Sequence, residues 1–186
     1  MALGADFDDV LAAARAGAEW AVAALYRDLQ PALLRYLRTK ERAYAEDIAS
    51  DAWLALGPLL ATFEGTEQEL RRLLFSIAHR RLVDHWRAAA RRGTVPVAPE
   101  DLAERRDADA TEDAGIAALT TQEALDTIRR HLSPEQADVL LLRVVGGLGV
   151  DEVASIVGKR PGAVRALQHR AITRLVTIFR AERVTR

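Results

Sequence analysis

The chain of 186 residues contains no cysteine. This absence excludes disulfide bonds, a thiolate nucleophile and zinc knuckles built on thiols, so any redox or metal sensing would have to reside on a partner. The chain also has almost no net charge, since 26 basic side chains stand against 27 acidic ones. Bulk electrostatic attraction to DNA or to a membrane is therefore not expected, and any surface for nucleic acid must be local.

Long hydrophobic runs are missing as well. No stretch approaches the roughly 18–20 uninterrupted apolar residues of a membrane span, and the N-terminus lacks a basic segment followed by an apolar one. We therefore expect no membrane insertion and a cytoplasmic location. Apolar residues still make up 49% of the chain, enough for real hydrophobic cores in one or two domains.

Catalytic signals are also lacking. The four histidines are scattered singly along the chain, and neither a His-Glu-x-x-His motif nor a Gly-rich phosphate loop occurs. No pair of carboxylates lies in an apolar pattern typical of an acid-base site. We expect a protein that is not an enzyme and that needs no metal or other cofactor.

The distribution of charge along the chain predicts two domains. Residues 1–92 carry a net charge of 0, residues 93–118 carry −5, and residues 119–186 carry +4. The middle segment has two prolines and almost no large apolar side chains, so it cannot bury enough surface to offset the entropy of ordering. We expect a flexible acidic linker at 93–118 between domains at 1–92 and 119–186.

Both flanks of this linker show helical periodicity and little strand signal, which predicts an all-α protein of two small helical domains. In the first domain we expect helices at about 7–16, 19–38, 43–62 and 67–92. Pro58 should distort or end the third of these helices unless it lies in the last turns. Trp20, Trp53 and Trp86 are expected in the core, as is Phe63, although Phe63 or Trp86 could instead stack on a base.

The second domain begins with a strong helix start, Ser133-Pro134-Glu135-Gln136. Serine is a good N-cap, proline suits the first helical position, and Gln136 completes a capping box. This helix is predicted to stop at Gly146-Gly147, because glycine adopts the left-handed conformation of a helix C-cap. A short helix over 150–157, a turn and a long helix over 161–179 follow. We expect a four-helix domain that contains a DNA-binding helix-turn-helix.

The long helix has two distinct faces on a helical wheel. The apolar face holds Val164, Leu167, Ala171 and Leu175 and is expected to be the core face. The opposite face holds Gly162, Arg165, Ala166, His169, Arg170 and Thr173, a set with small residues for close approach and cations for base edges or phosphates. An ordinary basic helix end would account for Arg180 and Arg183, but not for cations near the helix N-terminus, where they are unfavourable.

Two charged segments of the first domain point to partners. Residues 71–92 carry seven arginines against Asp84 alone, and because like charges repel along a helix we interpret them as phosphate contacts. Asp84 could simply pair with Arg87. Upstream, Glu46 and Asp47 are explained as acids at a helix N-terminus, whereas Asp51 indicates a basic partner surface.

Each flank carries several motifs in a fixed order. In the first flank they are Ala45-Glu46-Asp47-Ile48-Ala49-Ser50-Asp51-Ala52-Trp53, Phe63-Glu64-Gly65, and Ile77-Ala78-His79-Arg80 with Asp84 and Arg87. In the second flank they are Leu132-Ser133-Pro134-Glu135-Gln136, Leu142-Arg143, Gly147-Leu148, Asp151-Glu152-Val153-Ala154, and Gly162 to Ala171. Together these motifs resemble the extracytoplasmic-function (ECF) sigma factors of bacterial RNA polymerase. The similarity covers roughly residues 7–180, and the order and spacing of the motifs make it specific.

The resemblance implies a protein that binds core RNA polymerase through its β′ and β subunits, directs initiation at promoter DNA, and has an anti-sigma factor as a partner. The docking residues would be Glu46, Asp47 and Asp51. The −10 element would be bound by Phe63, Gly65, Arg80, Arg81, Asp84, Arg87 and Arg91. The −35 element would be bound by Lys159, Arg160, Gly162, Arg165, Ala166, His169, Arg170 and Thr173. The acidic linker could mimic RNA in the exit path.

Two positions depart from the family pattern at helix starts. Arg160 stands where Ser or Thr commonly caps the recognition helix, and because arginine cannot accept a backbone N–H we expect it to contact DNA. Gly149 stands at another common Ser or Thr cap, at a small loss of stability.

Two other functions remain compatible with parts of the pattern. A stand-alone helix-turn-helix regulator would also need the reading helix, but it would not need a second basic helix and an acidic docking face in the first domain. A purely protein-binding helical adapter would show no salt-dependent affinity for DNA.

Overall fold

The computed structural model describes residues 3–91 and 122–184. Within these residues every regular element is a helix, which confirms the all-α fold class. The chain divides into two compact units, Met1–Leu82 and Val83–Arg186, and the division falls inside one continuous helix. The linker at 93–118 and the domain boundaries at 92 and 119 lie outside the described residues and stay predictions. Among the described helices, none has the length and apolar character needed to cross a membrane.

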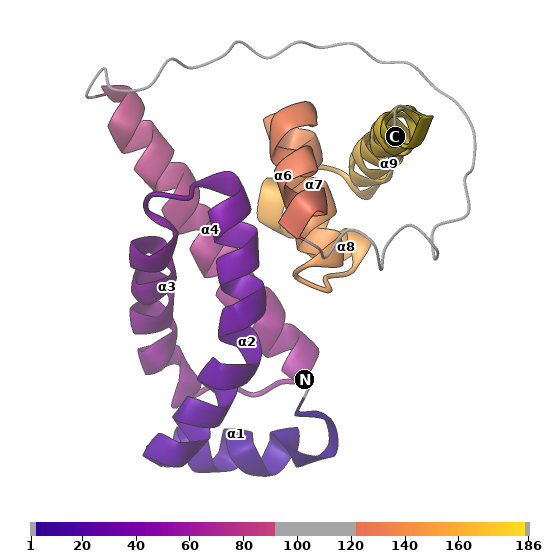
Figure 1. The fold of residues 1–186 in the computed structure, drawn as a ribbon. Coiled ribbons are helices and arrows are strands. Elements are labelled where there is room, and N and C mark those ends of the chain that lie inside the picture. Colours follow the sequence, from indigo (N-terminus) through magenta and orange to yellow (C-terminus); the bar gives the residue numbers. More distant parts are fainter. Residues whose placement is uncertain (1–2, 92–121, 185–186) are drawn as a thin grey trace. The chain divides into compact units, whose positions relative to one another are not determined.

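Four helices begin in the first unit, the last of them continuing across the division, and their positions agree with the sequence prediction to within about two residues (Figure 1). They are α1 (Phe7–Arg15), α2 (Glu19–Lys40), α3 (Ala45–Leu60) and α4 (Glu67–Arg91), preceded by a short 3₁₀ helix, η1 (Gly4–Asp6). Pro58 lies in the last turn of α3, where it does not interrupt the helix.

The core of the first unit forms where α1, α3 and α4 pack against α2. Leu25, Leu29 and Leu33 recur every four residues along α2 and are at most 2% exposed, as an amphipathic helix requires. Further along, the Tyr36 ring lies 5.8 Å from the Phe75 ring of α4. The buried Tyr36 hydroxyl forms a 2.8 Å hydrogen bond with Nδ1 of His79.

The prediction that Trp20 belongs to the core is wrong, because its side chain is 60% exposed. Trp20 lies on the side of α2 away from the buried leucines, and within the described part of the chain it stays largely open to solvent. Trp53, Trp86 and Phe63 are half-buried.

A nearly buried ion pair joins α2 to α4. The Arg71 guanidinium lies 3.2 Å from the Asp28 carboxylate, and the two side chains are 16% and 5% exposed. Arg71 is also 3.6 Å from Glu67, one helical turn away. Arg71 is therefore engaged inside the first unit and does not contribute a phosphate contact at its surface.

Replacing Arg71 by methionine is expected to lower the free energy of unfolding by about 2–3 kcal/mol, because the Asp28 carboxylate stays buried without its guanidinium. Urea unfolding followed by circular dichroism measures the change. The double variant Asp28→Leu, Arg71→Met removes both charges and is expected to recover most of the loss. A single variant as stable as the wild type would show that the pair does not stabilise the packing of α2 on α4.

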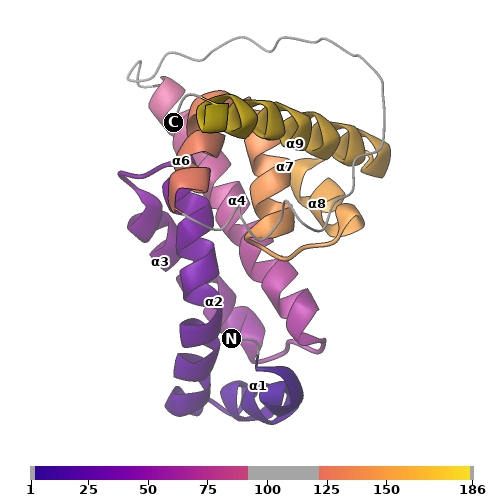
Figure 2. The same cartoon turned by 45° about the vertical axis from the view of Figure 1, so that its right-hand side comes forward.

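The second unit contains the four helices α6 (Gln122–His131), α7 (Pro134–Val144), α8 (Val150–Val157) and α9 (Pro161–Val184). Figure 2 shows α9 running past the other three, all of which it contacts. The prediction of a four-helix domain is confirmed, and α6 is the helix whose position the sequence left open. Ser133 and Gln136 form the predicted capping box, with N–H···O distances of 3.3 and 3.2 Å.

Two adjacent glycines end α7 for different reasons. Gly147 has the left-handed φ of +66° that the prediction required. Gly146 is buried, and a Cβ there would lie 2.6 Å from the carbonyl oxygen of Leu142. Gly146 thus permits a close backbone approach, and Gly147 permits the change of direction toward α8.

Candidate functional site

Helix α9 separates its core residues from its exposed ones as the helical wheel predicts. Val164, Leu167, Ala171 and Leu175 are at most 6% exposed. On the opposite side Gly162, Arg165, Ala166 and Thr173 are exposed, and His169 and Arg170 are half-buried. The face predicted for DNA is therefore accessible along about three turns of the helix.

The turn between α8 and α9 gives this helix an open N-terminus. Gly158 ends α8 with a φ of +67°, and the Arg160 carbonyl then accepts the N–H groups of Ala163 and Val164 at 2.9 and 3.1 Å. Arg160 thus begins α9 through its backbone alone, and its side chain stays exposed for a partner. At the start of α8, Gly149 lacks a capping side chain, but its N–H donates to Glu152 Oε2 at 2.6 Å.

Lys159 is already engaged within the second unit. Its ammonium lies 2.5 Å from the Glu135 carboxylate at the start of α7, and the two side chains are 30% and 49% exposed. A phosphate contact by Lys159 would have to replace this ion pair. Of the two cations in the turn, Arg160 is thus the more available one.

Helix α4 presents a row of exposed arginines. Arg80, Arg87 and Arg91 follow one another at intervals of seven and four residues, which places them on one side of the helix, and all three are exposed. Arg81 is exposed on a flank of this row. Asp84 lies 3.7 Å from Arg87 with both side chains more than half exposed, so it screens that cation only weakly.

Arg72 is one of the seven arginines interpreted from the sequence as phosphate contacts, and it is exposed. It precedes Arg80 by eight residues, which places it about 80° around the helix from the row. Arg71, its neighbour in the sequence, points to Asp28 instead.

The loop over 61–66 is closed by its own side chains. Phe63 is half-buried, and a Cβ added at Gly65 would lie 2.9 Å from its ring. Thr66 and Glu69 form a reciprocal cap, in which Thr66 N–H donates to Glu69 Oε2 at 2.8 Å and Glu69 N–H donates to Thr66 Oγ1 at 3.3 Å. Gly65 thus allows the aromatic ring to fold back over the loop.

The Thr66 cap also acts on the ionisation of Glu69. The hydrogen bond from the Thr66 backbone, followed by that from its side chain, lowers the pKa of the Glu69 carboxyl. A lowered pKa means that the cap contributes stability while the carboxylate is ionised. This contribution is present above the ordinary pKa of glutamate and is lost as the pH falls through the lowered value.

Helix α3 exposes the three predicted docking acids. Asp47 and Asp51 lie one turn apart, and both are exposed. Glu46 forms a 2.7 Å ion pair with Arg38 of α2, with both side chains more than half exposed. Asp47 and Asp51 therefore share one side of α3, whereas Glu46 lies toward α2 and is already shared with a cation.

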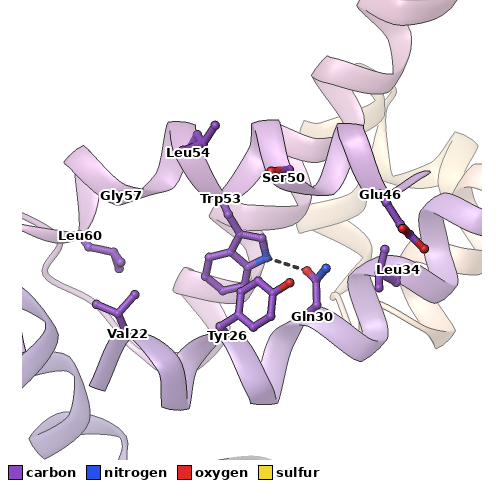
Figure 3. A pocket seen from close by; sticks show the side chains of 10 residues that line it. All are labelled: Val22, Tyr26, Gln30, Leu34, Glu46, Ser50, Trp53, Leu54, Gly57 and Leu60. Atoms are coloured by element: carbon purple, nitrogen blue, oxygen red, sulfur yellow. Dashed lines mark hydrogen bonds between the residues drawn. The ribbon is translucent and has the colours of Figure 1, made fainter. Parts of the chain in front are cut away.

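An apolar groove lies beside these acids and was not predicted from the sequence (Figure 3). It has a volume of about 500 Å³ between α2 and α3. The Tyr26 and Trp53 rings meet on its floor with centroids 5.1 Å apart, and the Trp53 indole donates to Gln30 Oε1 at 2.7 Å. Leu54, 73% exposed, lies at its rim. The signal in the sequence is that α3 carries apolar residues on more than its buried side.

The geometry thus defines a two-part helical protein with a helix-turn-helix in one part and separate acidic and basic surfaces in the other. The model of Sigma-70 region 2 matches residues 25–92, and that of Sigma-70, region 4 matches residues 122–175. The chain is 34% identical over 178 residues to the ECF RNA polymerase sigma factor SigD of Mycobacterium tuberculosis, covering 92% of this chain and 83% of SigD. It is 32% identical over 160 residues to the ECF RNA polymerase sigma factor ShbA of Streptomyces griseus, covering 81% of this chain and 83% of ShbA. The chain belongs to the ECF sigma factors.

The resemblance noted in the sequence is thereby confirmed. As a member of this family the protein is an RNA polymerase sigma factor, which binds core RNA polymerase and directs transcription initiation at promoter DNA. The match to region 2 does not favour a stand-alone regulator. Among solved structures, CnrH in complex with the cytosolic domain of CnrY has a TM-score of 0.59 at 20% identity, covering 92% of this chain and 96% of that one. This likeness shows the fold.

Proposed function

We propose that the three exposed surfaces divide the work of a sigma factor among them. The acidic surface of α3 with its groove docks on core polymerase, the arginine row of α4 binds the −10 element, and the open face of α9 reads the −35 element. The observation that carries this proposal is the opposite charge of the exposed side chains on α3 and on α4. Helix α3 exposes acids and α4 exposes arginines, as expected for one protein partner and one nucleic acid.

The docking surface combines charge with an apolar anchor site. Asp47 and Asp51 would meet basic side chains of the β′ subunit, while the groove beside Trp53 would receive apolar side chains of the same subunit. Buried aromatic and aliphatic contacts supply most of the affinity at such interfaces, and the charges supply orientation and association rate. Glu46 would exchange its Arg38 partner for one on the polymerase.

The −10 surface would hold single-stranded DNA along α4. Arg80, Arg87 and Arg91 would neutralise successive phosphates, with Arg81 on the flank. The neighbouring loop, with Phe63 over Gly65, would receive an extruded base, because aromatic side chains stack on bases of any sequence. Asp84 would orient Arg87.

The −35 surface would place the N-terminal half of α9 in the major groove. Arg165, His169 and Arg170 would contact base edges or phosphates, and the small Gly162 and Ala166 would allow the helix to approach closely. Arg160 would bind a phosphate at the open helix end, joined by Lys159 if it leaves Glu135. Thr173 would complete the face.

Replacing Arg165 by alanine is expected to cost about 1–3 kcal/mol in binding to the best −35 sequence and to relax the preference at one position. Holoenzyme binding to promoters with single substitutions in the −35 element measures both effects. Arg174→Ala, which removes an exposed arginine from another side of α9, is the matched control. A uniform loss across all sequences would instead make Arg165 a phosphate contact.

Three wider expectations follow from the same proposal. Domains at 1–92 and 119–186 would carry the two halves of the function, joined by the acidic linker at 93–118. The protein itself would catalyse no reaction, since its role is to direct the polymerase, and it would act in the cytoplasm. An anti-sigma factor would regulate it, in keeping with the family and with the CnrH complex.

The experiment that tests the division of work compares one variant per surface in a reconstituted holoenzyme. The α3 variants should lose core polymerase in a pull-down. The α4 variants should keep the polymerase but fail to open promoter DNA, as followed by permanganate reactivity of unpaired thymines. The α9 variants should keep the polymerase, and their holoenzyme should still initiate on a promoter pre-melted at −10. Loss of all three readouts by each variant would contradict the division.

A further inference from the structure

A single arginine of α7 joins the recognition helix to the loop that precedes α8. Nε of Arg143 donates to Gln168 Oε1 at 3.1 Å, and Nη1 donates to the carbonyl oxygen of Leu148. Gln168 lies on α9 and is only 4% exposed, and Leu148 is fully buried. Because the guanidinium is planar and its donors have a fixed geometry, these two bonds together define one position of α9 relative to α7.

Gln168 lies between the two faces of α9. It is adjacent to the buried Leu167 on one side and to His169 on the other, and it follows Arg165 by three residues, so the two share one side of the helix. A rotation of α9 that moved Arg165 and His169 relative to DNA would also pull the Gln168 amide away from Arg143. Since a buried amide is costly without a partner, such rotations are disfavoured.

A second polar contact from α7 reaches the turn of the helix-turn-helix. Glu135, in the first turn of α7, pairs with Lys159 in the turn before α9. Helix α7 thus contacts the loop before α8, the turn after α8 and the middle of α9. The directional bonds of the planar Arg143 guanidinium therefore restrict the rotation of α9 in addition to the apolar packing of its core face.

We propose that Arg143 is a positioning residue, which sets the rotation of α9 about its own axis and through it the base preference at the −35 element. This inference rests on the function proposed for α9. Arg143 itself would not touch DNA, since its donors are directed to Gln168 and Leu148. The alternative is a purely structural role, in which Arg143 contributes to stability but not to which bases are preferred.

The test measures stability and base preference separately. The variants are Arg143→Leu and the double variant Arg143→Leu, Gln168→Leu, each reconstituted as full chain with core polymerase on a promoter library randomised at −35. The single variant is expected to be destabilised, because Gln168 keeps a buried amide. The double variant should regain stability by replacing both partners with apolar groups. Both are expected to lose discrimination at one or more −35 positions by about tenfold, within the range that a single base pair contributes.

Two further variants complete the design. Gln168→Glu keeps an acceptor for Arg143 and is expected to retain the base preference of the wild type. Arg130→Leu removes an exposed arginine of α6 that bonds only to its own helix, and it controls for the loss of one positive charge. A double variant that is stable and retains the full wild-type −35 preference would overturn the positioning role.

Failure of this inference differs from failure of the proposed function. If α9 does not read the −35 element, the wild-type holoenzyme itself would show no preference within the randomised −35 library. If α9 reads it but Arg143 does not set its angle, the wild type would show a clear preference and every folded variant would share it.

Discussion

Changing Asp47 and Asp51 together to arginine is expected to weaken binding to core RNA polymerase about a thousandfold, or about 4 kcal/mol. Both carboxylates are exposed on α3 beside the apolar groove, and reversal places two cations against the basic surface that they would otherwise attract. Competition with a fluorescent wild-type chain for core polymerase measures the affinity. Because neither side chain is buried, the helical circular dichroism should be unchanged.

The matched control reverses two exposed acids elsewhere in the same unit. Asp8→Arg, Asp9→Arg changes the net charge of α1 by the same amount without touching α3. It is expected to leave polymerase affinity within a few-fold of the wild type. Equal losses in both double variants would make the effect one of net charge, and an unchanged affinity of the α3 variant would remove Asp47 and Asp51 from the docking surface.

Replacing Arg80, Arg87 and Arg91 together by alanine is expected to reduce promoter opening at least a hundredfold while core polymerase binding is retained. If each arginine neutralises one phosphate of single-stranded DNA, the slope of log affinity against log salt concentration should fall by about 2. Opening is measured by permanganate reactivity, and the slope by titration of a pre-melted promoter between low and physiological salt.

A charge-matched triple variant distinguishes a direct contact between the α4 arginines and DNA from a general effect of net charge. Arg27, Arg35 and Arg42 are exposed in the first unit and lie outside α4, so their replacement by alanine removes an equal charge. That variant should open promoters nearly as well as the wild type. If it fails to the same extent, or if the α4 variant keeps the wild-type salt slope, the arginine row is not the −10 surface.

The helices and their faces were largely predictable from the sequence, because they depend on local spacing. Periodicity located seven of the described α-helices, and the cap of α7 followed from Ser133 and Gln136. Helix α6 was not located, since few of its residues are apolar. The exposed face of α9 followed directly from a helical wheel.

Contacts between distant residues were not predictable in this way. Arg71 belongs to a basic stretch in the sequence, yet Asp28 of α2 engages it. Lys159 likewise forms an ion pair with Glu135, which lies 24 positions earlier in the sequence. Trp20 was expected in the core because tryptophan usually is, but the leucines of α2 already fill the core. The groove between α2 and α3 exists only once the two helices pack together.

Transcription reconstituted from core RNA polymerase and a pool of promoter fragments, with and without this protein, measures whether the chain directs the polymerase to promoters. We expect new start sites that depend on the protein and share two upstream elements at the −35 and −10 spacing. Binding of the protein to DNA with no association with core polymerase and no new transcripts would contradict this expectation, and would favour a regulator that acts alone.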